Sequence, residues 1–285
     1  MMRVDMHFHS FCSDGSDSPE ALARLGKKRG LAVMSLTDHD TMKGVPAFMS
    51  MCRKLGIRAV SGVEISAEYP RTLHILGYNY DPQDEEFRAA LAKIQYYREE
   101  RNRRVLAKLN ELGIPITLKD VQDEAGKGVI GRPHFAYALI RKGVVHDVPT
   151  AFSEYLGREG KAYVHKVSLS PEETIRAIHR AGGLSVLAHP VQTCPDIREL
   201  PDILRWLKSL GLWGLECYSG HHSREQSKAY KALAAANGLE VTAGPAFPCR
   251  GRPRGPHHGR GRPGYHFGVS VPEDLLPWAR LGLRM

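Results

Sequence analysis

Apolar and polar positions along the first part of the chain predict strands that alternate with helices. Short apolar runs predict strands at residues 3–7, 31–36, 57–65 and 72–78. Helical periodicity covers residues 19–28, with Ser18 as the N-cap, and residues 41–55, which end at Gly56. This strand–helix order predicts a parallel sheet or a barrel.

The pattern then becomes almost wholly helical before the strand–helix order returns. Helices are predicted at residues 85–112, 118–124, 133–141 and 149–155. Later helices are predicted at 171–180, 199–209 and 223–236, and strands at 184–188, 214–218 and 239–243. We therefore expect a barrel domain made of residues 1–82 and 160–285, with residues 83–159 as a helical insertion that caps the substrate.

Composition is typical of a globular protein of 285 residues, with 42% hydrophobic and 25% charged residues. The net charge of +9 suits a polyanionic partner, but residues 250–262 alone carry five arginines, so the net charge is weak evidence for the substrate.

No run approaches the roughly 20 apolar residues of a membrane span. The first residues lack a signal-peptide pattern, and the five scattered cysteines lack a C-x-x-C pair. We expect a cytoplasmic protein with reduced thiols and no membrane or obligate protein partner.

Histidine and carboxylate residues recur at the predicted carboxyl ends of strands. They are His7, His9, Asp14, His39, Glu64, His74 and His189. The carboxyl ends of barrel strands are where active sites are assembled, so these side chains are expected to converge. A mixed imidazole and carboxylate set favours Mn, Fe or Zn over Mg. A carboxylate such as Glu64 is able to bridge two cations, and paired cations assist phosphoryl hydrolysis.

Each of these residues also has an ordinary explanation when it is taken alone. A histidine at a strand end is more often packed or exposed than a ligand, and Asp14-Gly15 is a common turn sequence. The recurrence of the same residue types at successive strand ends is what favours a metal centre.

The motifs in their order resemble those of the PHP family, named for polymerase and histidinol phosphatase. They are His7-Phe8-His9-Ser10, Ser13-Asp14-Gly15, Thr37-Asp38-His39-Asp40, Gly62-Val63-Glu64 and Ala188-His189-Pro190. The resemblance implies a distorted seven-stranded β/α barrel that holds two to three divalent cations, with Mn the expected metal and Zn, Fe or Mg as alternatives. It assigns His7, His9 and Glu64 to one metal. Glu64, His74 and His189 would serve a second metal, and Asp14 and His39 a third.

Within the family, the chain looks like the branch that removes the 3′-phosphate of nucleoside 3′,5′-bisphosphates and degrades short RNA from its 5′ end. The matching stretches are Gly131-Arg132-Pro133-His134-Phe135-Ala136, Lys161-Ala162-Tyr163-Val164 and residues 216–222. The resemblance implies a nucleotide or short oligonucleotide substrate. Its candidate binding residues are Arg132, His134, Lys161, Ser219 and His222. Asp14 or His221 would protonate the leaving group.

The resemblance fails at the late Gly-Ser-Asp-Phe-His-like motif. Ala246 stands where the metal-binding Asp is expected, and Pro248 where the His is expected. Residues 244–264 are rich in Gly, Pro, Arg and His and lack apolar periodicity. Three explanations stay open. The stretch is atypical because its reading frame is altered, because the protein is a degenerate relative, or because a surrogate imidazole ligates the metal. The candidate surrogates are His257, His258 and His266.

Two other functions compete with nucleotide phosphatase activity. The altered motif suits a catalytically impaired protein that binds metal or nucleotide without turnover. The family also includes phosphatases of the histidinol phosphate type, although the helical insertion and the Arg132–His134 stretch favour a nucleotide.

Overall fold

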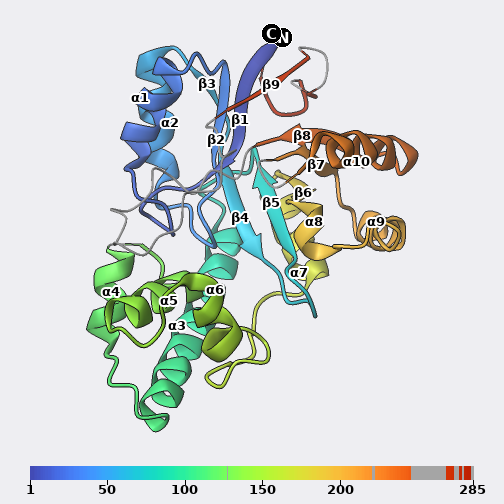
Figure 1. Ribbon diagram of the computed structural model, residues 1–285. Helices are drawn as coiled ribbons and strands as arrows, with labels where there is room; N and C mark the ends of the chain where they lie inside the picture. Colours follow the sequence, from blue (N-terminus) through green and yellow to red (C-terminus); the bar gives the residue numbers. More distant parts are fainter. Residues whose placement is uncertain (127, 220–221, 245–267, 273–275, 278, 284–285) are drawn as a thin grey trace.

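The computed structural model of the protein describes residues 1–126, 128–219, 222–244, 268–272, 276–277 and 279–283. The fold is mixed α/β, and its described strands lie in two sheets (Figure 1). The first sheet has the order β3-β2-β1-β9 and the second has the order β4-β5-β6-β7-β8. The strands are β1 (Met2–Phe8), β2 (Val33–Leu36), β3 (Arg58–Ala59), β4 (Gly62–Ser66), β5 (His74–Tyr78), β6 (Leu184–Leu187), β7 (Gly214–Tyr218), β8 (Glu240–Ala243) and β9 (Val269–Val271).

The helices begin and end close to the predicted residues, because most of them carry a clear local cap. Ser18, Ser170 and Ser223 each accept a backbone hydrogen bond at a helix start, as expected of N-cap serines. The helices are α1 (Pro19–Lys28), α2 (Val45–Leu55), α3 (Glu85–Glu111), α4 (Leu118–Ala125), α5 (Arg132–Arg141), α6 (Val148–Ala151), the π-helix Phe152–Leu156, α7 (Pro171–Arg180), α8 (Pro190–Thr193), α9 (Leu200–Ser209) and α10 (Arg224–Ala236).

The expectation of a parallel sheet is wrong for part of the second sheet. β5 pairs antiparallel with both β4 and β6, whereas β6, β7 and β8 run parallel. β4 and β5 are joined by the short loop 67–73, which returns the chain directly along its neighbour. A parallel pair would need a long crossover there, and the sequence has no helix in that interval to supply one.

The predicted strand at residues 57–65 is two strands that belong to different sheets. β3 pairs with β2, and β4 pairs with β5. The switch occurs at Val60 and Ser61, where Val60 N–H still donates to Met34 while the Ser61 carbonyl accepts from Asn79. Both parts are apolar, so the sequence pattern could not reveal that the chain changes sheets.

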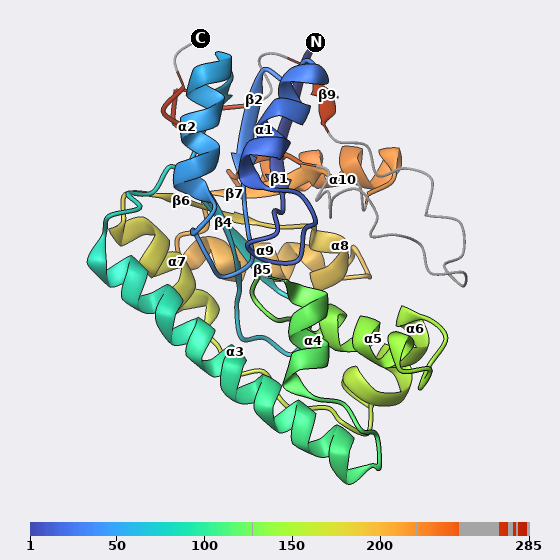
Figure 2. The same cartoon turned by 90° about the vertical axis from the view of Figure 1, so that its left-hand side faces the viewer.

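The two sheets share one apolar interior. Met6 and Val33 from the first sheet meet Leu76, Val186 and Ala243 from the second in a single buried cluster. On the outer side of the first sheet, α1 and α2 lie next to each other (Figure 2). A separate buried cluster covers the outer side of the second sheet and includes residues of α3, α7, α9 and α10.

The helices between β5 and α7 have a buried cluster of their own. It joins Val105 and Leu109 of α3 to Val121 of α4 and to Phe135 and Leu139 of α5. The long helix α3 runs from the second sheet to the far end of this helical unit, so it belongs to both parts (Figure 2). No helix among the described residues is long and apolar enough to cross a membrane.

Candidate metal centre

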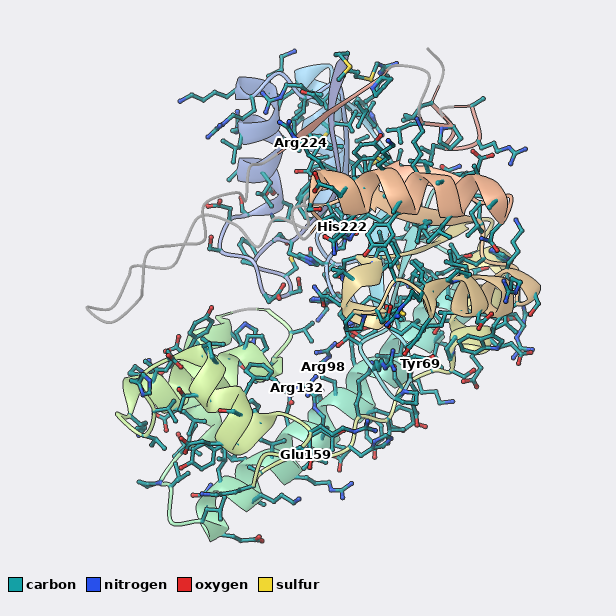
Figure 3. The ribbon with its side chains drawn as sticks, turned by 45° about the vertical axis from the view of Figure 1, so that its right-hand side comes forward. Tyr69, Arg98, Arg132, Glu159, His222 and Arg224 are labelled. Atoms are coloured by element: carbon teal, nitrogen blue, oxygen red, sulfur yellow. The ribbon has the colours of Figure 1, made fainter. Side chains whose placement is uncertain are left out.

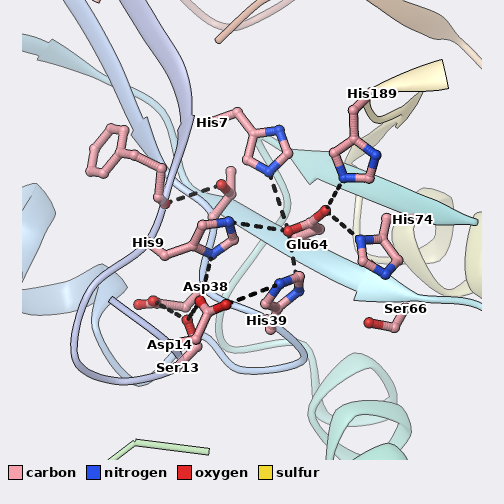
Figure 4. Close-up of polar contacts among 12 residues, drawn as sticks. His7, His9, Ser13, Asp14, Asp38, His39, Glu64, Ser66, His74 and His189 are labelled. Atoms are coloured by element: carbon pink, nitrogen blue, oxygen red, sulfur yellow. Dashed lines mark hydrogen bonds and ion pairs between the residues drawn. The ribbon is translucent and has the colours of Figure 1, made fainter. Parts of the chain in front are cut away.

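Five imidazoles surround the carboxylate of Glu64, which is itself 1% exposed (Figure 4). Glu64 lies in β4, and its partners come from β1, β5 and the segments after β1, β2 and β6. The nitrogen-to-oxygen distances are 3.2 Å to His7, 3.3 Å to His9, 3.1 Å to His39, 2.7 Å to His74 and 2.9 Å to His189. The structure therefore brings together the histidines that the sequence placed at separate strand ends.

Asp14 completes one side of this cluster. Its two carboxylate oxygens lie 3.7 Å from His9 Nδ1 and 3.7 Å from His39 Nε2. The side chain is more open than Glu64, with 27% of its area exposed. Asp14 thus lies between the buried imidazoles and the solvent-accessible mouth of the site.

The geometry groups these ligand atoms differently from the sets that the family resemblance implies. His7, Glu64 and His189 offer ligand atoms that all lie within 4.8 Å of one another, and so do His9, His39 and Glu64. The resemblance instead placed His7 with His9. Glu64 belongs to both groups in either scheme, which is what a carboxylate that bridges two cations requires.

Several buried polar atoms of the cluster make no hydrogen bond with the described residues. They include His7 Nε2, His39 Nδ1 and Glu64 Oε2. Buried polar atoms are rarely left in this state, because each costs about 1–3 kcal/mol. Imidazole nitrogens and a carboxylate oxygen that converge without hydrogen bonds are a suitable donor set for a divalent cation. The residues present therefore fit the metals that the sequence predicts.

The protonation states of His9, His74 and Glu64 also suit metal binding. Burial lowers the pKa of His9 to about 4 and the pKa of His74 to about 3, so both imidazoles are neutral near pH 7. Burial by itself would raise the pKa of Glu64, but the surrounding imidazoles, His39 foremost, hold that pKa well below its ordinary value. Neutral imidazoles and ionised carboxylates are the forms that bind metals.

A second carboxylate lies behind the cluster. Glu216 of β7 is fully buried, and its Oε1 lies 2.8 Å from His7 Nδ1. Its Oε2 accepts a hydrogen bond of 2.6 Å from the backbone N–H of His189. Carboxylates in this position fix the orientation of metal-binding histidines. The sequence motifs do not predict this role, although Glu216, like Glu64, is an acidic residue within an apolar strand.

The loop that carries Asp14 is held by the buried carboxylate of Asp38. Asp38 accepts three hydrogen bonds of 2.7 Å, from the backbone N–H and hydroxyl of Ser10 and from the hydroxyl of Ser13. Burial raises the pKa of Asp38 to about 6, even though these bonds oppose the shift. Ser10 and Ser13, the serines of the first two motifs, therefore hold the loop between His9 and Asp14 through Asp38.

Backbone strain is also concentrated at this site. Among the described residues other than glycine, only Asp40, Asn79 and His189 have positive φ angles, of 53°, 55° and 24°. Such conformations cost on the order of 1–3 kcal/mol unless the surroundings stabilise them. Asp40 follows His39, and its carboxylate accepts from Ser66 N–H and pairs with Arg98. Two of the three strained residues therefore lie at or next to a candidate ligand.

A cavity of about 420 Å³ opens beside the metal centre, and its wall is rich in cations. Figure 3 labels two of them, Arg98 and Arg132. Asp14, His39 and His74 line the cavity together with residues of α3, α5 and the segment before α7. The basic side chains on its wall are Arg71, Arg98, Arg101, Arg132, Arg158, His165 and Lys166. Such a wall suits a phosphate group.

The cations on this wall lie close enough to lower one another's pKa values. Burial first, and then the neighbouring Arg98, lower the pKa of Arg101 to about 9. Burial also lowers the pKa of Lys166 to about 7. Of these residues, only Arg132 is indicated by the sequence motifs. Arg98 and Arg101 could have been found from their spacing, because residues three apart share one face of a helix.

The other candidate substrate residues have different positions. His134 is buried, and its Nδ1 accepts the backbone N–H of Gly131 at the start of α5, as a helix cap does. Lys161 is exposed, lies 5.7 Å from the ring centre of Tyr155 and is absent from the cavity wall. Lys166, five residues later, is the lysine that lines the cavity.

Ser219 and His222, which follow β7, do not line the cavity. Ser219 is buried, and His222 Nδ1 lies 3.2 Å from the Cys217 carbonyl while its ring packs against Tyr230. His221 lies outside the described residues.

The unusual late segment begins next to the metal centre. Gly244 follows β8, and a Cβ atom at this position would lie only 2.4 Å from the backbone nitrogen of His7. This close approach requires glycine. The residues that carry the altered motif and its surrogate histidines lie outside the described residues. They are Ala246, Pro248, His257, His258 and His266.

Comparisons with known proteins agree with this geometry. The family model of the PHP domain matches residues 5–146. A 3′,5′-nucleoside bisphosphate phosphatase of Chromobacterium violaceum is 31% identical over 98% of this chain and 95% of its own length. A 5′-3′ exoribonuclease of Haemophilus influenzae is 30% identical over 87% of this chain and 91% of its own. The structure of a protein described as a metal-dependent phosphoesterase, from Bifidobacterium adolescentis, superposes with a TM-score of 0.78 at 31% identity. That superposition covers 88% of this chain and 90% of the other.

Proposed function

The chain belongs to the PHP family and is a metal-dependent phosphoesterase, and from this premise we propose that it hydrolyses the 3′-phosphate of nucleoside 3′,5′-bisphosphates. We propose short 5′-phosphorylated RNA as a second substrate, because one similar protein is named a 5′-3′ exoribonuclease. The observation that carries the proposal is a single cavity whose wall includes both the candidate metal ligands and a cluster of cations.

The two parts of the cavity suit the two phosphates of such a substrate. The phosphate to be cleaved would lie at Asp14, His39 and His74, and the 5′-phosphate would lie on the cationic wall. Arg98 and Arg132 there offer planar guanidinium groups, which bind phosphate oxygens in pairs. Arg98 is also held by Asp40, the residue after His39, so the two sites are joined by one contact.

We propose two to three divalent cations per chain, with Mn the expected metal. His7, Glu64 and His189 would hold one cation, and His9, His39 and Glu64 another, with Asp14 and His74 completing the set. When bound, the cations supply Lewis-acid stabilisation of the phosphoryl oxygens and activation of water. Arg98, Arg132 and Lys166 would orient the substrate and offset its charge.

Hydrolysis also needs a side chain that donates a proton to the leaving group. Burial would raise the pKa of Asp14, but the neighbouring His39 and His9 hold that pKa below its ordinary value. Asp14 therefore carries no proton near neutral pH and is better suited to bind a cation than to protonate a leaving group. His221 stays the candidate donor from the sequence.

We propose that residues 83–159 act as a capping unit over the substrate and that the strands form the distorted barrel of the family. The cap is supported by Arg98, Arg101 and Arg132, which reach the cavity from this unit. The barrel is supported by the apolar interior shared between the two sheets and by the bridge between His39 and Glu64. The four described cysteines are free thiols, which agrees with a cytoplasmic location.

The test is a comparison of substrates with the purified protein and Mn²⁺. A nucleoside 3′,5′-bisphosphate should release phosphate with a higher kcat/KM than the nucleoside 3′-monophosphate, which lacks the second phosphate. Histidinol phosphate should be a poor substrate. A Glu64→Gln variant should lose bound metal and turnover together. Equal rates on the bisphosphate and the monophosphate would refute the role given to the cationic wall.

A further inference from the structure

One part of the cavity wall is aromatic and has no role in the function described so far. The loop 67–73 between β4 and β5 lines the cavity with Tyr69, Pro70 and Leu73, five or more residues beyond Glu64. Figure 3 shows Tyr69 relative to Arg98 and Arg132 of the cationic wall. A nucleotide has a flat base as well as its phosphates, and the cationic wall and metal centre account only for the phosphates.

The loop that carries Tyr69 is held in place at several points. Its first and last residues are joined by a 3.0 Å hydrogen bond from Ala67 N–H to the Leu73 carbonyl. The ammonium group of Lys166 donates to the Ala67 carbonyl at 2.8 Å. Arg71 pairs with Glu199 next to α9 at 2.7 Å. The loop that carries Tyr69 is therefore closed by its own hydrogen bond and fixed to two neighbouring segments, at Lys166 and at Glu199.

The ring of Tyr69 is held as well. It stacks on the indole of Trp206 in α9, with 5.7 Å between the ring centres and 24° between the planes. Tyr69 lines the cavity and Trp206 does not, so the indole supports the phenol ring from outside. An immobilised ring loses little conformational entropy when a ligand stacks on it.

The other aromatic side chain to consider is Phe152 of the π-helix. It also lines the cavity, but the guanidinium of Arg132 lies 5.8 Å from its ring centre. That arrangement places Phe152 next to a phosphate-binding cation. Tyr69 instead shares the cavity wall with Gln192, and the amide of Gln192 is able both to donate and to accept hydrogen bonds at a base edge.

We propose that Tyr69, backed by Trp206, is the stacking platform for the nucleobase of the substrate. This inference rests on the proposed function, since it names the third part of the nucleotide that the same cavity binds. Stacking on a phenol ring accepts any base, because every base has a π face. The platform would thus give affinity for nucleotides without strong preference among the four bases.

The experiment compares two substrates that differ only in the base. One is adenosine 3′,5′-bisphosphate, and the other is 1,4-anhydroribitol 3,5-bisphosphate, which has the same sugar and phosphates. With the full-length protein and Mn²⁺, Tyr69→Ala should lower kcat/KM on the nucleotide at least about fivefold more than on the abasic analogue, the lower end of what base stacking contributes. Most of the loss should lie in KM. Tyr69→Phe should keep the wild-type ratio, and Tyr69→Leu should behave like Tyr69→Ala.

Tyr96→Ala is the matched control, because Tyr96 is a tyrosine of α3 that is 59% exposed and does not line the cavity. It should leave both rates unchanged. Equal losses on the two substrates for Tyr69→Ala would overturn the proposal and make Tyr69 a packing residue only. A wild-type protein that prefers neither substrate would also overturn it. Absence of turnover on both substrates in the wild type would instead refute the proposed function, so the two failures are distinguishable.

Discussion

Glu216 lies directly behind His7, with 2.8 Å between Glu216 Oε1 and His7 Nδ1, while the opposite ring nitrogen of His7 lies 3.2 Å from Glu64. The imidazole is therefore held between two carboxylates. Burial alone would lower the pKa of His7, but Glu216 and Glu64 outweigh it and hold that pKa well above its ordinary value. Because Glu216 lies on Nδ1, Nε2 is the nitrogen of His7 that faces the cation site, where a bound cation would displace its proton.

The first prediction concerns this carboxylate. Glu216→Gln should keep the side-chain volume but weaken metal binding about 10–100-fold, the usual effect of removing a group that orients a ligand. Bound Mn²⁺ should be measured by titration of the metal-free protein. Glu111→Gln, at the exposed end of α3, is the control and should bind metal as the wild type does. Unchanged affinity in Glu216→Gln would contradict the orienting role.

The second prediction concerns the loop between His9 and Asp14. Asp38→Asn replaces a carboxylate that accepts three hydrogen bonds, and the amide nitrogen cannot accept. We expect a loss of about 1–3 kcal/mol in the free energy of unfolding and fewer cations bound per chain, because Asp14 is no longer held near His39. Thermal unfolding with and without Mn²⁺, together with metal analysis, measures both effects.

The control for Asp38→Asn is Asp123→Asn on α4, where the carboxylate is exposed and forms a surface ion pair with Lys119. It should change the free energy of unfolding by no more than about 0.5 kcal/mol and leave the metal content unchanged. A normal metal content in a destabilised Asp38→Asn protein would show that the loop is structural and does not place Asp14.

The third prediction concerns Arg132, which sequence and structure both point to. Arg132→Ala should weaken binding of a nucleoside 3′,5′-bisphosphate by about 1.5–3 kcal/mol, because a charge-assisted hydrogen bond to phosphate is lost. The affinity should be measured by calorimetry. Arg176→Ala on the exposed face of α7 removes the same charge away from the cavity and should leave the affinity unchanged. Equal affinities for Arg132→Ala and the wild type would make Arg132 a merely structural side chain.

The fourth prediction uses the unusual pKa of Lys166. Burial lowers it to about 7, so the side chain loses its charge as pH rises above 7. If only the cationic form binds the substrate's phosphate, affinity should fall by up to about tenfold per pH unit from pH 7 to 9. Lys166→Arg keeps its charge in this range and should remove most of the dependence. The same pH dependence in both proteins would show that another group titrates.

The lowered pKa of Lys166 should make the stability of the fold increase with pH, whereas the affinity for substrate decreases. The folded-state pKa of Lys166 is below its unfolded value, so the unfolded state binds the proton more tightly. The contribution of this group to the free energy of unfolding should therefore increase as pH rises from about 7 toward 10. Chemical unfolding of the wild type and Lys166→Met across this range measures the difference.

The fifth prediction concerns the altered late motif, for which only the sequence is informative. A protein with Ala246→Asp and Pro248→His should bind more metal and turn over faster than the protein with the present sequence. The added carboxylate would offset repulsion between close dications, and the added imidazole would supply a further ligand. Metal content and 3′-phosphate release from a nucleoside bisphosphate should be measured for both. Equal values would point to His257, His258 or His266 as ligands instead.

The sequence by itself determined the local elements and the identity of most candidate ligands. Helices such as α1 and α7 could be placed to the residue, because an N-cap serine and a following proline specify where the chain enters a helix. The histidines and Glu64 could be selected because they lie in or directly after apolar strands. The expectation that all of them lie at carboxyl ends is wrong for His74, which begins β5 and reaches the same edge because β5 runs antiparallel to β4. These are local signals, contained within a few residues of the chain.

Only the tertiary structure decided how these pieces combine. The change of sheet at Val60 and Ser61 is invisible in an apolar run, and so is the antiparallel placement of β5. The grouping of His7 with His189 and Glu216 joins residues about 200 positions apart. The contact between Arg98 and Asp40, the residue after His39, joins α3 to the segment after β2 across 58 positions. Hydrophobic burial is not directional, so periodicity states which face of an element is buried but not what it is buried against.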